Sequence, residues 1–131
     1  MKKWVLRIKY NMKQEDKDLL LRDLCGRLPY GVILQCCETV GERLCSIDDK
    51  GLINNDYDIE EVKPCLFPMS AMTEEQIKEA LSTKHKINLS SGKVIYLDSL
   101  DTFKFYNKNH IDDKGLVPMN LAVDATNLNV Y

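Results

Sequence analysis

The sequence has no apolar run long enough to cross a membrane, and no repeat or low-complexity tract. Arg7 and Lys9 interrupt the apolar stretch near the N-terminus, so we expect no export signal and a cytoplasmic location. Glycine (6 residues), proline (4) and aromatic residues (8%) are sparse. The 131 residues suit one domain, residues 1–131, with its own hydrophobic core.

Motifs of metal sites and of common catalytic centres are also missing. The chain has 5 cysteines, an odd number, with only His85 and His110 and no Cys-x-x-Cys pair. Without an export signal, we expect these cysteines to be reduced thiols that pack as small hydrophobic side chains. No phosphate-binding loop, dinucleotide fingerprint or nucleophile elbow occurs. We therefore expect no cofactor, no metal and no catalytic residue, which favours a protein that is not an enzyme.

Hydrophobic periodicity predicts an α+β fold. Alternation of apolar and polar residues indicates strands, and a leucine stripe at three- and four-residue spacing indicates a helix. The pattern predicts a strand at 4–8, a helix at 14–28, strands at 32–37, 43–48 and 52–53, and a hairpin turn at 40–42. The last three strands would form an antiparallel meander, and we expect 32–37 to be the central strand of the sheet. This arrangement is compatible with an Sm-like or SH3-like barrel.

The stretch before the second predicted helix has the most specific local chemistry. Pro64 and Pro68 hold the backbone extended and remove two N–H donors, so we expect a crossing segment and not a strand. Leu66, Phe67 and Met69 are too apolar for an exposed loop. The sequence therefore predicts a proline brace with these side chains anchored in the core.

A helix start follows the brace. Thr73 and Gln76 have capping-box spacing, and Met72 and Ile77 have the spacing of a hydrophobic staple. We expect this helix to run to about Thr83, with Ile77, Ala80 and Leu81 buried. A loop at 88–92 and a strand at 94–97 should follow, and then a third helix that Asp98 or Ser99 caps and whose stripe is Leu100, Phe103, Tyr106 and Asn107. After Gly115 we expect a packed irregular end.

Three blocks of the chain, LCGRLPYGV, EEVKPCLFPMSAMTEEQ and DDKGLVPMNLAVDATNLNVY, resemble a family of short uncharacterised proteins of gut Bacteroidetes and their phages and prophages. That family has a Lys-Pro-x-Leu-x-Pro-Met-Ser-x-Met-Thr-Glu-Glu segment between a small β region and a helical end. This sequence departs from it at Cys65, where the family has an aromatic residue. The resemblance implies a cytoplasmic protein of a bacterial host cell, encoded by a phage or prophage, and transfers no activity or catalytic residue.

Acidic residues gather between Glu38 and Val62, where the local net charge is −6. Alternating oxygen-bearing side chains from Asn54 onward suggest a calcium loop, but Ile59 and Cys65 stand where an EF-hand needs Gly and Glu. A solvated face or a partner-binding surface is therefore favoured over a metal site. The candidate partner-binding residues are Asp48, Asp49, Asp56, Asp58, Glu60 and Glu61. With a net charge of −2, direct nucleic-acid binding is not expected.

Two classes of function remain. The preferred one is a non-enzymatic phage or prophage accessory protein that binds a host protein, with interference in host defence as its role. The alternative is a small-ligand protein or hydrolase for nucleotide signals, with a pocket between the meander and the proline brace. Its candidate ligand residues are Arg27, Tyr30, Arg43 and Tyr57, because guanidinium groups hold phosphates and aromatic rings stack on bases. The competing interpretation is that Tyr30 packs at a turn and the arginines are solvated.

Overall fold

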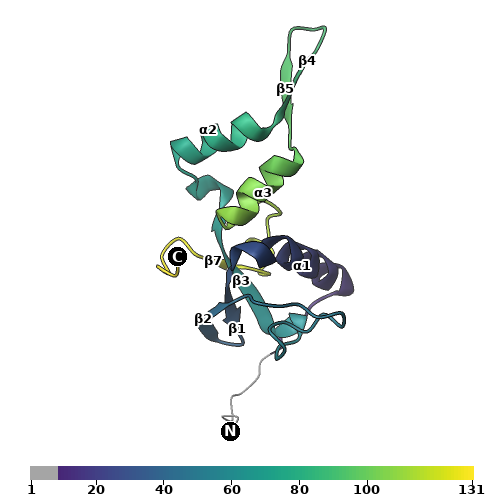
Figure 1. Ribbon diagram of the computed structural model, residues 1–131, viewed down its shortest axis with the longest axis vertical. Helices are drawn as coiled ribbons and strands as arrows, with labels where there is room; N and C mark the ends of the chain where they lie inside the picture. Colours follow the sequence, from purple (N-terminus) through teal and green to yellow (C-terminus); the bar gives the residue numbers. More distant parts are fainter. Residues whose placement is uncertain (1–8) are drawn as a thin grey trace.

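The fold consists of a small mixed sheet covered by one helix, with a helix–hairpin–helix arm extending from it (Figure 1). The computed structural model describes residues 9–131, so the strand predicted at 4–8 lies outside the described residues. The helices are α1 (Gln14–Arg27), α2 (Glu74–Thr83) and α3 (Leu100–Lys108), and the strands are β1 (Ile33–Cys36), β2 (Thr39–Arg43), β3 (Val62–Pro68), β4 (His85–Asn88), β5 (Val94–Leu97), β6 (Ile111–Asp112) and β7 (Val123–Asp124). The chain is thus an α+β protein, as predicted.

Strand β3 is the centre of the sheet. The strand order is β2-β1-β3-β6, and β7 also pairs with β3. β1 is antiparallel to both β2 and β3, whereas β6 and β7 run parallel to β3. Residues 62–64 of β3 pair with β1, residues 65–66 with β7 and residues 67–68 with β6. The central strand of the sheet is therefore β3, whereas the sequence analysis predicted residues 32–37 for that position.

The expectation that Pro64 and Pro68 exclude a strand is wrong. β3 extends through both prolines, with Pro64 opposite Leu34 and Pro68 opposite Asp112. A proline removes one donor but keeps an extended backbone and its carbonyl. Each proline of β3 is paired on one edge, so one missing N–H leaves the ladder intact. The neighbouring Phe67 N–H still donates to the His110 carbonyl, at 2.8 Å.

The predicted meander is also only partly correct. The turn after β1 lies at Cys37 and Glu38, and residues 40–42 belong to β2. Arg43 ends β2, and the rest of the strands predicted at 43–48 and 52–53 is a loop, in which isolated bridges join Ile47 to Ile53 and Ile53 to Tyr57. The Asn54 side chain binds backbone groups of this loop, accepting from the Cys45 N–H at 2.7 Å. Hydrogen bonds from a side chain thus take the place of strand pairing in this loop. The sheet of residues 9–131 stays open, with β2 and β6 at its ends.

The main core lies between α1 and the sheet. Leu20 and Leu24 of α1 pack with Val32 and Leu34 and are fully buried. The segment after Gly115 is mostly irregular and supplies further core residues, Leu116, Leu121 and Ala122. This confirms the packed irregular end. No helix in residues 9–131 has the length and apolar character to span a membrane.

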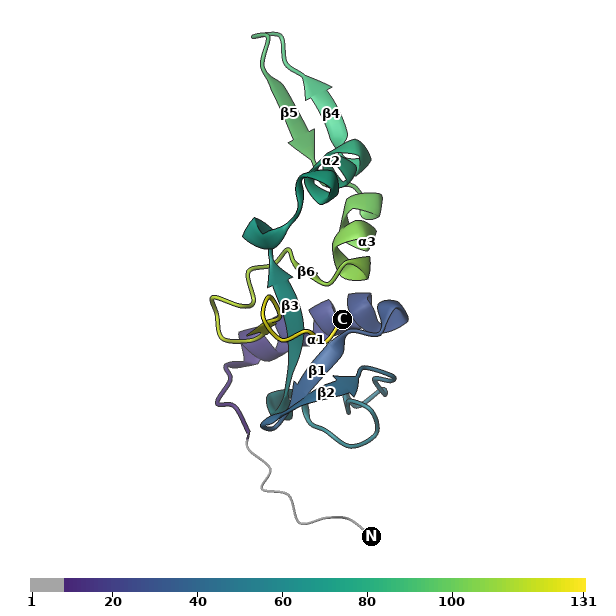
Figure 2. The same ribbon diagram turned by 90° about the vertical axis from the view of Figure 1, so that its left-hand side faces the viewer.

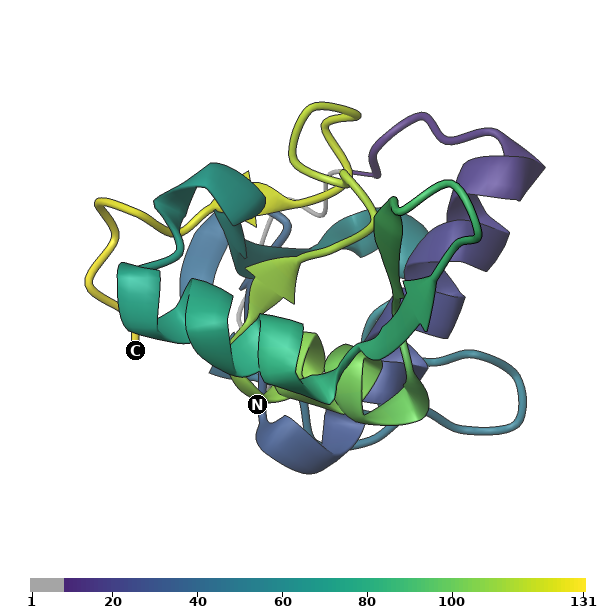
Figure 3. The same cartoon turned by 90° about the horizontal axis from the view of Figure 1, so that it is seen from above.

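The capping residues predicted from the sequence mark where the two helices of the arm begin. The Gln76 N–H donates to the Thr73 hydroxyl at 3.1 Å, and the Thr73 N–H donates to the Gln76 side chain at 3.0 Å, so the predicted capping box is confirmed. Ser99 caps α3 in the same way, by accepting from the Thr102 N–H. α2 and α3 pack against each other at the base of the hairpin (Figures 1 and 3).

Burial in the arm differs from the prediction. Ile77 and Leu81 of α2 are exposed, and so are Leu100 and Phe103 of α3. Ala80 of α2 and Tyr106 of α3 are buried as predicted, and they pack together with Phe105, in the second turn of α3. Sequence analysis also missed β4, which occupies residues expected to be a helix end and a loop. β4 and β5 form a two-stranded hairpin that projects beyond both helices (Figure 2).

Candidate functional site

Arg27, the first nucleotide-site candidate, is buried inside the fold. Its Nε donates to Asp23 at 2.8 Å, and its Nη2 donates to the Ile111 carbonyl at 2.7 Å and to Asp113 at 3.0 Å. The Lys114 ammonium lies 3.0 Å from the second carboxylate oxygen of Asp23. The guanidinium thus joins α1 to the segment after α3. Two of its acceptors follow it by more than 80 positions in the chain, a relation that no local pattern reveals.

The other three candidates lie at different places. Tyr30 is half-buried at the end of a short 3-10 helix, Leu28–Tyr30, as the competing interpretation expected. Arg43 is exposed on β2, with its aliphatic carbons against Gly31. Tyr57 packs at the edge of the main core, and burial raises the pKa of its hydroxyl to about 12. None of these residues lines the pocket described next.

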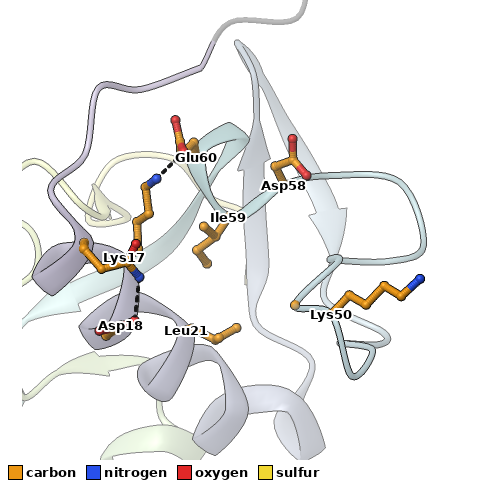
Figure 4. A pocket seen from close by; sticks show the side chains of 9 residues that line it. Lys17, Asp18, Leu21, Lys50, Asp58, Ile59 and Glu60 are labelled. Atoms are coloured by element: carbon orange, nitrogen blue, oxygen red, sulfur yellow. Dashed lines mark hydrogen bonds and ion pairs between the residues drawn. The ribbon is translucent and has the colours of Figure 1, made fainter.

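A pocket of about 220 Å³ lies between α1 and the acidic segment (Figure 4). Its charged lining residues are Lys17, Asp18, Lys50, Asp58 and Glu60. Lys17 forms an ion pair with Glu60, and Asp18 accepts a hydrogen bond from Gln14. The pocket is below the roughly 300 Å³ at which ligand pockets usually begin. Carboxylates outnumber ammonium groups in it, so it is poorly suited to a phosphate.

Several acidic residues of the segment support its own backbone. Asp48 accepts hydrogen bonds from the N–H groups of Lys50 and Leu52. Asp58 and Glu61 form the capping box of the short 3-10 helix Ile59–Glu61, and Glu61 is buried. Asp58 also pairs with Lys9 at 3.1 Å, and Glu60 pairs with Lys17. Of the six candidates, Asp49, Asp56 and Asp58 are exposed, and Asp58 is held by Lys9. The acidic segment is therefore largely engaged within the fold.

The cysteines divide into two groups. Cys36, Cys37 and Cys65 are buried, as expected, whereas Cys25 and Cys45 are exposed. Burial raises the pKa of Cys65 to about 11, so this thiol stays protonated and unreactive at neutral pH. In residues 9–131 no three His, Cys, Asp or Glu side chains are arranged to hold a metal ion.

The β4–β5 hairpin carries an exposed apolar face. Pairing places His85 opposite Leu97 and Ile87 opposite Ile95, and these cross-strand pairs share one face of the ribbon. We call Ile87, Ile95 and Leu97 the apolar face; their exposed fractions are 37%, 40% and 49%. Among the element pairs in substantial contact within residues 9–131, β4 and β5 contact only each other. Each of these three residues is thus more than one-third exposed within the described part of the chain.

Hydrogen bonds and an ion pair fix the base of the hairpin. Lys84 and Asp98 flank the two strands and form an ion pair at 3.2 Å. The Ser99 hydroxyl donates to the Thr83 carbonyl at 2.6 Å, and the Thr83 hydroxyl bonds to Thr102 at 2.8 Å. These contacts tie the end of α2 to the start of α3. The hairpin is thus presented from a fixed base.

Exposed apolar residues continue onto the helices of the arm. Ile77 and Leu81 are four residues apart on α2, and Leu100 and Phe103 are three apart on α3, so each pair shares a face of its helix. Their exposed fractions range from 43% to 71%. The sequence analysis interpreted these residues as core.

The sequence matches no protein-family model, and comparison with the curated proteins and with the solved structures gives no match either.

Proposed function

We propose that this protein acts by binding another protein through the arm formed by α2, β4, β5 and α3. The observation that carries the proposal is the exposed apolar face of a hairpin whose two strands, within residues 9–131, make substantial contact only with each other. Isolated two-stranded hairpins are marginally stable in water, and contiguous exposed apolar patches mark interaction sites. A partner that covers this face would bury apolar area and stabilise the ribbon.

The arm replaces the acidic segment as the surface that we favour. Asp48, Asp58, Glu60 and Glu61 already bind groups of their own fold. Carboxylates in such roles are poorly placed to bind a partner, because a new contact would have to displace the existing one. The resemblance to phage and prophage proteins supports a host-cell protein as the partner, and interference with host defence as the consequence for the cell.

The nucleotide alternative has weaker support. Arg27 is buried among carboxylates, and the pocket beside α1 is lined by Asp18, Asp58 and Glu60. The carboxylates around Arg27 already hold its guanidinium, and in the pocket three carboxylates stand against the ammonium groups of Lys17 and Lys50, so a phosphate would meet more negative than positive charge in it.

Quantitative affinity capture from a host lysate tests the proposal. The test variant is Ile87→Ser/Ile95→Ser, which removes two side chains of the apolar face. The matched control is Asp49→Asn/Asp56→Asn, which changes two exposed acids of the competing surface. We expect the wild type and the control to recover the same partner, and the test variant to recover at least about tenfold less. Circular dichroism checks that the helices are intact.

Two results would contradict the proposal. One is full recovery of the partner by Ile87→Ser/Ile95→Ser. The other is loss of the partner in Asp49→Asn/Asp56→Asn alone, which would return the interface to the acidic segment.

A further inference from the structure

Each strand of the hairpin has one unpaired edge in the described chain. β4 pairs with β5 and with no other strand of residues 9–131, and the reverse holds for β5. Backbone N–H and C=O groups of a strand point alternately to its two edges, so about half of those in β4 point outward. An unpaired edge of this kind is a template for an added strand.

The charges on the hairpin have a single sign. From His85 to Leu97 there is no acidic residue, whereas Lys86 and Lys93 are both exposed. Neither lysine forms an ion pair with another described residue. Lys86 lies opposite Tyr96, on the face of the ribbon away from Ile87. Side chains along β4 therefore alternate between the two faces of the ribbon: Lys86 and Asn88 lie on one face, and His85 and Ile87 lie on the other.

A second copy of this chain is a poor occupant of the hairpin. Strands of four residues rise roughly 3.3 Å per residue and lie about 4.8 Å apart. Face-to-face packing of two ribbons would thus cover on the order of 150 Å² per copy, against about 800 Å² per partner in a stable interface. Edge-to-edge pairing of two β4 strands would bring two Lys86 ammonium groups near each other, without an acid between them.

We propose that the hairpin binds its partner as an added β-strand on the β4 edge, and that this strand alternates acidic and apolar residues. The inference rests on the proposed function of the arm. Main-chain hydrogen bonds along the edge supply affinity that the small apolar face lacks. Acidic side chains of the added strand lie beside Lys86, and its apolar side chains extend the face formed by Ile87, Ile95 and Leu97. Alternation of the two residue types matches the alternation of the two faces.

Peptide binding measured by fluorescence anisotropy at low salt tests this inference on the full chain. The probes are a labelled eight-residue peptide in which Glu alternates with Val, the same peptide with Lys in place of Glu, and a Glu–Val peptide methylated on every backbone nitrogen. The protein variants are Lys86→Glu/Lys93→Glu and, as a control with the same change in net charge, Lys13→Glu/Lys50→Glu. All four lysines are exposed, so the fold is expected to survive both changes.

We expect the Glu–Val peptide to bind the wild type at least about tenfold more tightly than the Lys–Val or the methylated peptide. Lys86→Glu/Lys93→Glu should reverse the preference between the Glu–Val and Lys–Val peptides, and Lys13→Glu/Lys50→Glu should keep it. Equal binding of the methylated peptide would overturn the proposal that the partner binds as an added strand. An unchanged preference in Lys86→Glu/Lys93→Glu would overturn the proposal that this strand is acidic.

Other occupants of the arm give distinct results. A dimer seen by sedimentation equilibrium and abolished by Ile87→Ser/Ile95→Ser would overturn the inference in favour of a second copy. Binding to phosphatidylserine vesicles in place of the Glu–Val peptide would overturn it in favour of a membrane surface. If no peptide binds but Ile87→Ser/Ile95→Ser still loses the lysate partner, the inference fails while the proposed function stands.

Discussion

The Tyr131 ring stacks on the His110 imidazole, with ring centroids 3.8 Å apart and planes 11° apart. The Tyr131 hydroxyl accepts from the Ile33 N–H and donates to the Cys65 carbonyl, both at 2.8 Å. These bonds attach the C-terminal residue to β1 and β3. Burial, together with the positive charges of Arg27 and Arg43, lowers the pKa of His110 to about 4. The imidazole is therefore neutral when it stacks at neutral pH.

His110 should make stability depend on pH between about 6.5 and 4. An unfolded histidine has a pKa of about 6.5, so in this window the unfolded chain binds a proton that the folded chain does not. The free energy of unfolding should thus fall as the pH is lowered. His110→Asn removes this contribution, and Asn tolerates the positive φ of 58° found at this position. Urea denaturation at several pH values should give a shallower fall for His110→Asn than for the control His85→Asn, whose histidine is exposed; equal slopes would exclude the assignment.

Removal of Arg27 should be severely destabilising. Arg27→Leu leaves the buried Asp23 and the largely buried Asp113 without their guanidinium partner. Loss of one member of a buried ion pair costs about 3–5 kcal/mol. Arg22→Leu, on the exposed side of the same helix, should change stability by less than about 0.5 kcal/mol. Chemical denaturation compares the two, and similar losses would mean that the buried network contributes little.

Truncation along β3 and at Met69, which directly follows it in the short 3-10 helix Met69–Ala71, should give a graded series. Leu66 is fully buried, Phe67 is partly buried between two small clusters, and Met69 is 40% exposed. We expect losses of about 3–4 kcal/mol for Leu66→Ala, about 2–3 kcal/mol for Phe67→Ala and less than about 0.5 kcal/mol for Met69→Ala. Phe67 thus remains an anchor, whereas Met69 does not. Denaturant midpoints measure the order of the three losses. A larger loss for Met69→Ala than for Leu66→Ala would contradict the burial of Leu66 and the exposure of Met69.

The cap of α2 should contribute a smaller amount. Thr73→Ala removes the hydroxyl that accepts from the Gln76 N–H, and we expect a loss of about 1 kcal/mol. Thr73→Ser keeps an acceptor at the same place and serves as the control. Urea denaturation should separate the two variants; identical curves would show that the cap bond is not formed in solution.

A nucleotide screen should be flat. A ligand present at a hundred times its dissociation constant stabilises a fold by about 2.7 kcal/mol, which raises the melting temperature by several degrees. We expect no such rise with cyclic or linear nucleotides, because Arg27 is already bound by Asp23 and Asp113. A clear rise that is lost in Arg43→Ala would favour the small-ligand alternative.

Interactions between residues close in the chain were predictable from the sequence. The capping box of Thr73 and Gln76, the cap at Ser99 and the leucine stripe of α1 each involve residues within a few positions, and each is present in the structure. Their geometry depends on the helix itself, so the spacing of residue types is sufficient. The β1 strand followed for the same reason, from a run of β-forming residues bounded by turns.

Contacts between residues distant in the chain were determined only by the tertiary structure. The partners of Arg27 lie in the segment after α3, and β3 becomes a central strand because β1, β6 and β7 each pair with a different part of it. The exposure of Ile95 and Leu97 has the same origin. Apolar spacing predicts which residues share a face, but what covers that face depends on how the elements pack. In residues 9–131 the apolar face of the hairpin stays exposed, so the surface that we propose for binding was visible only in the folded chain.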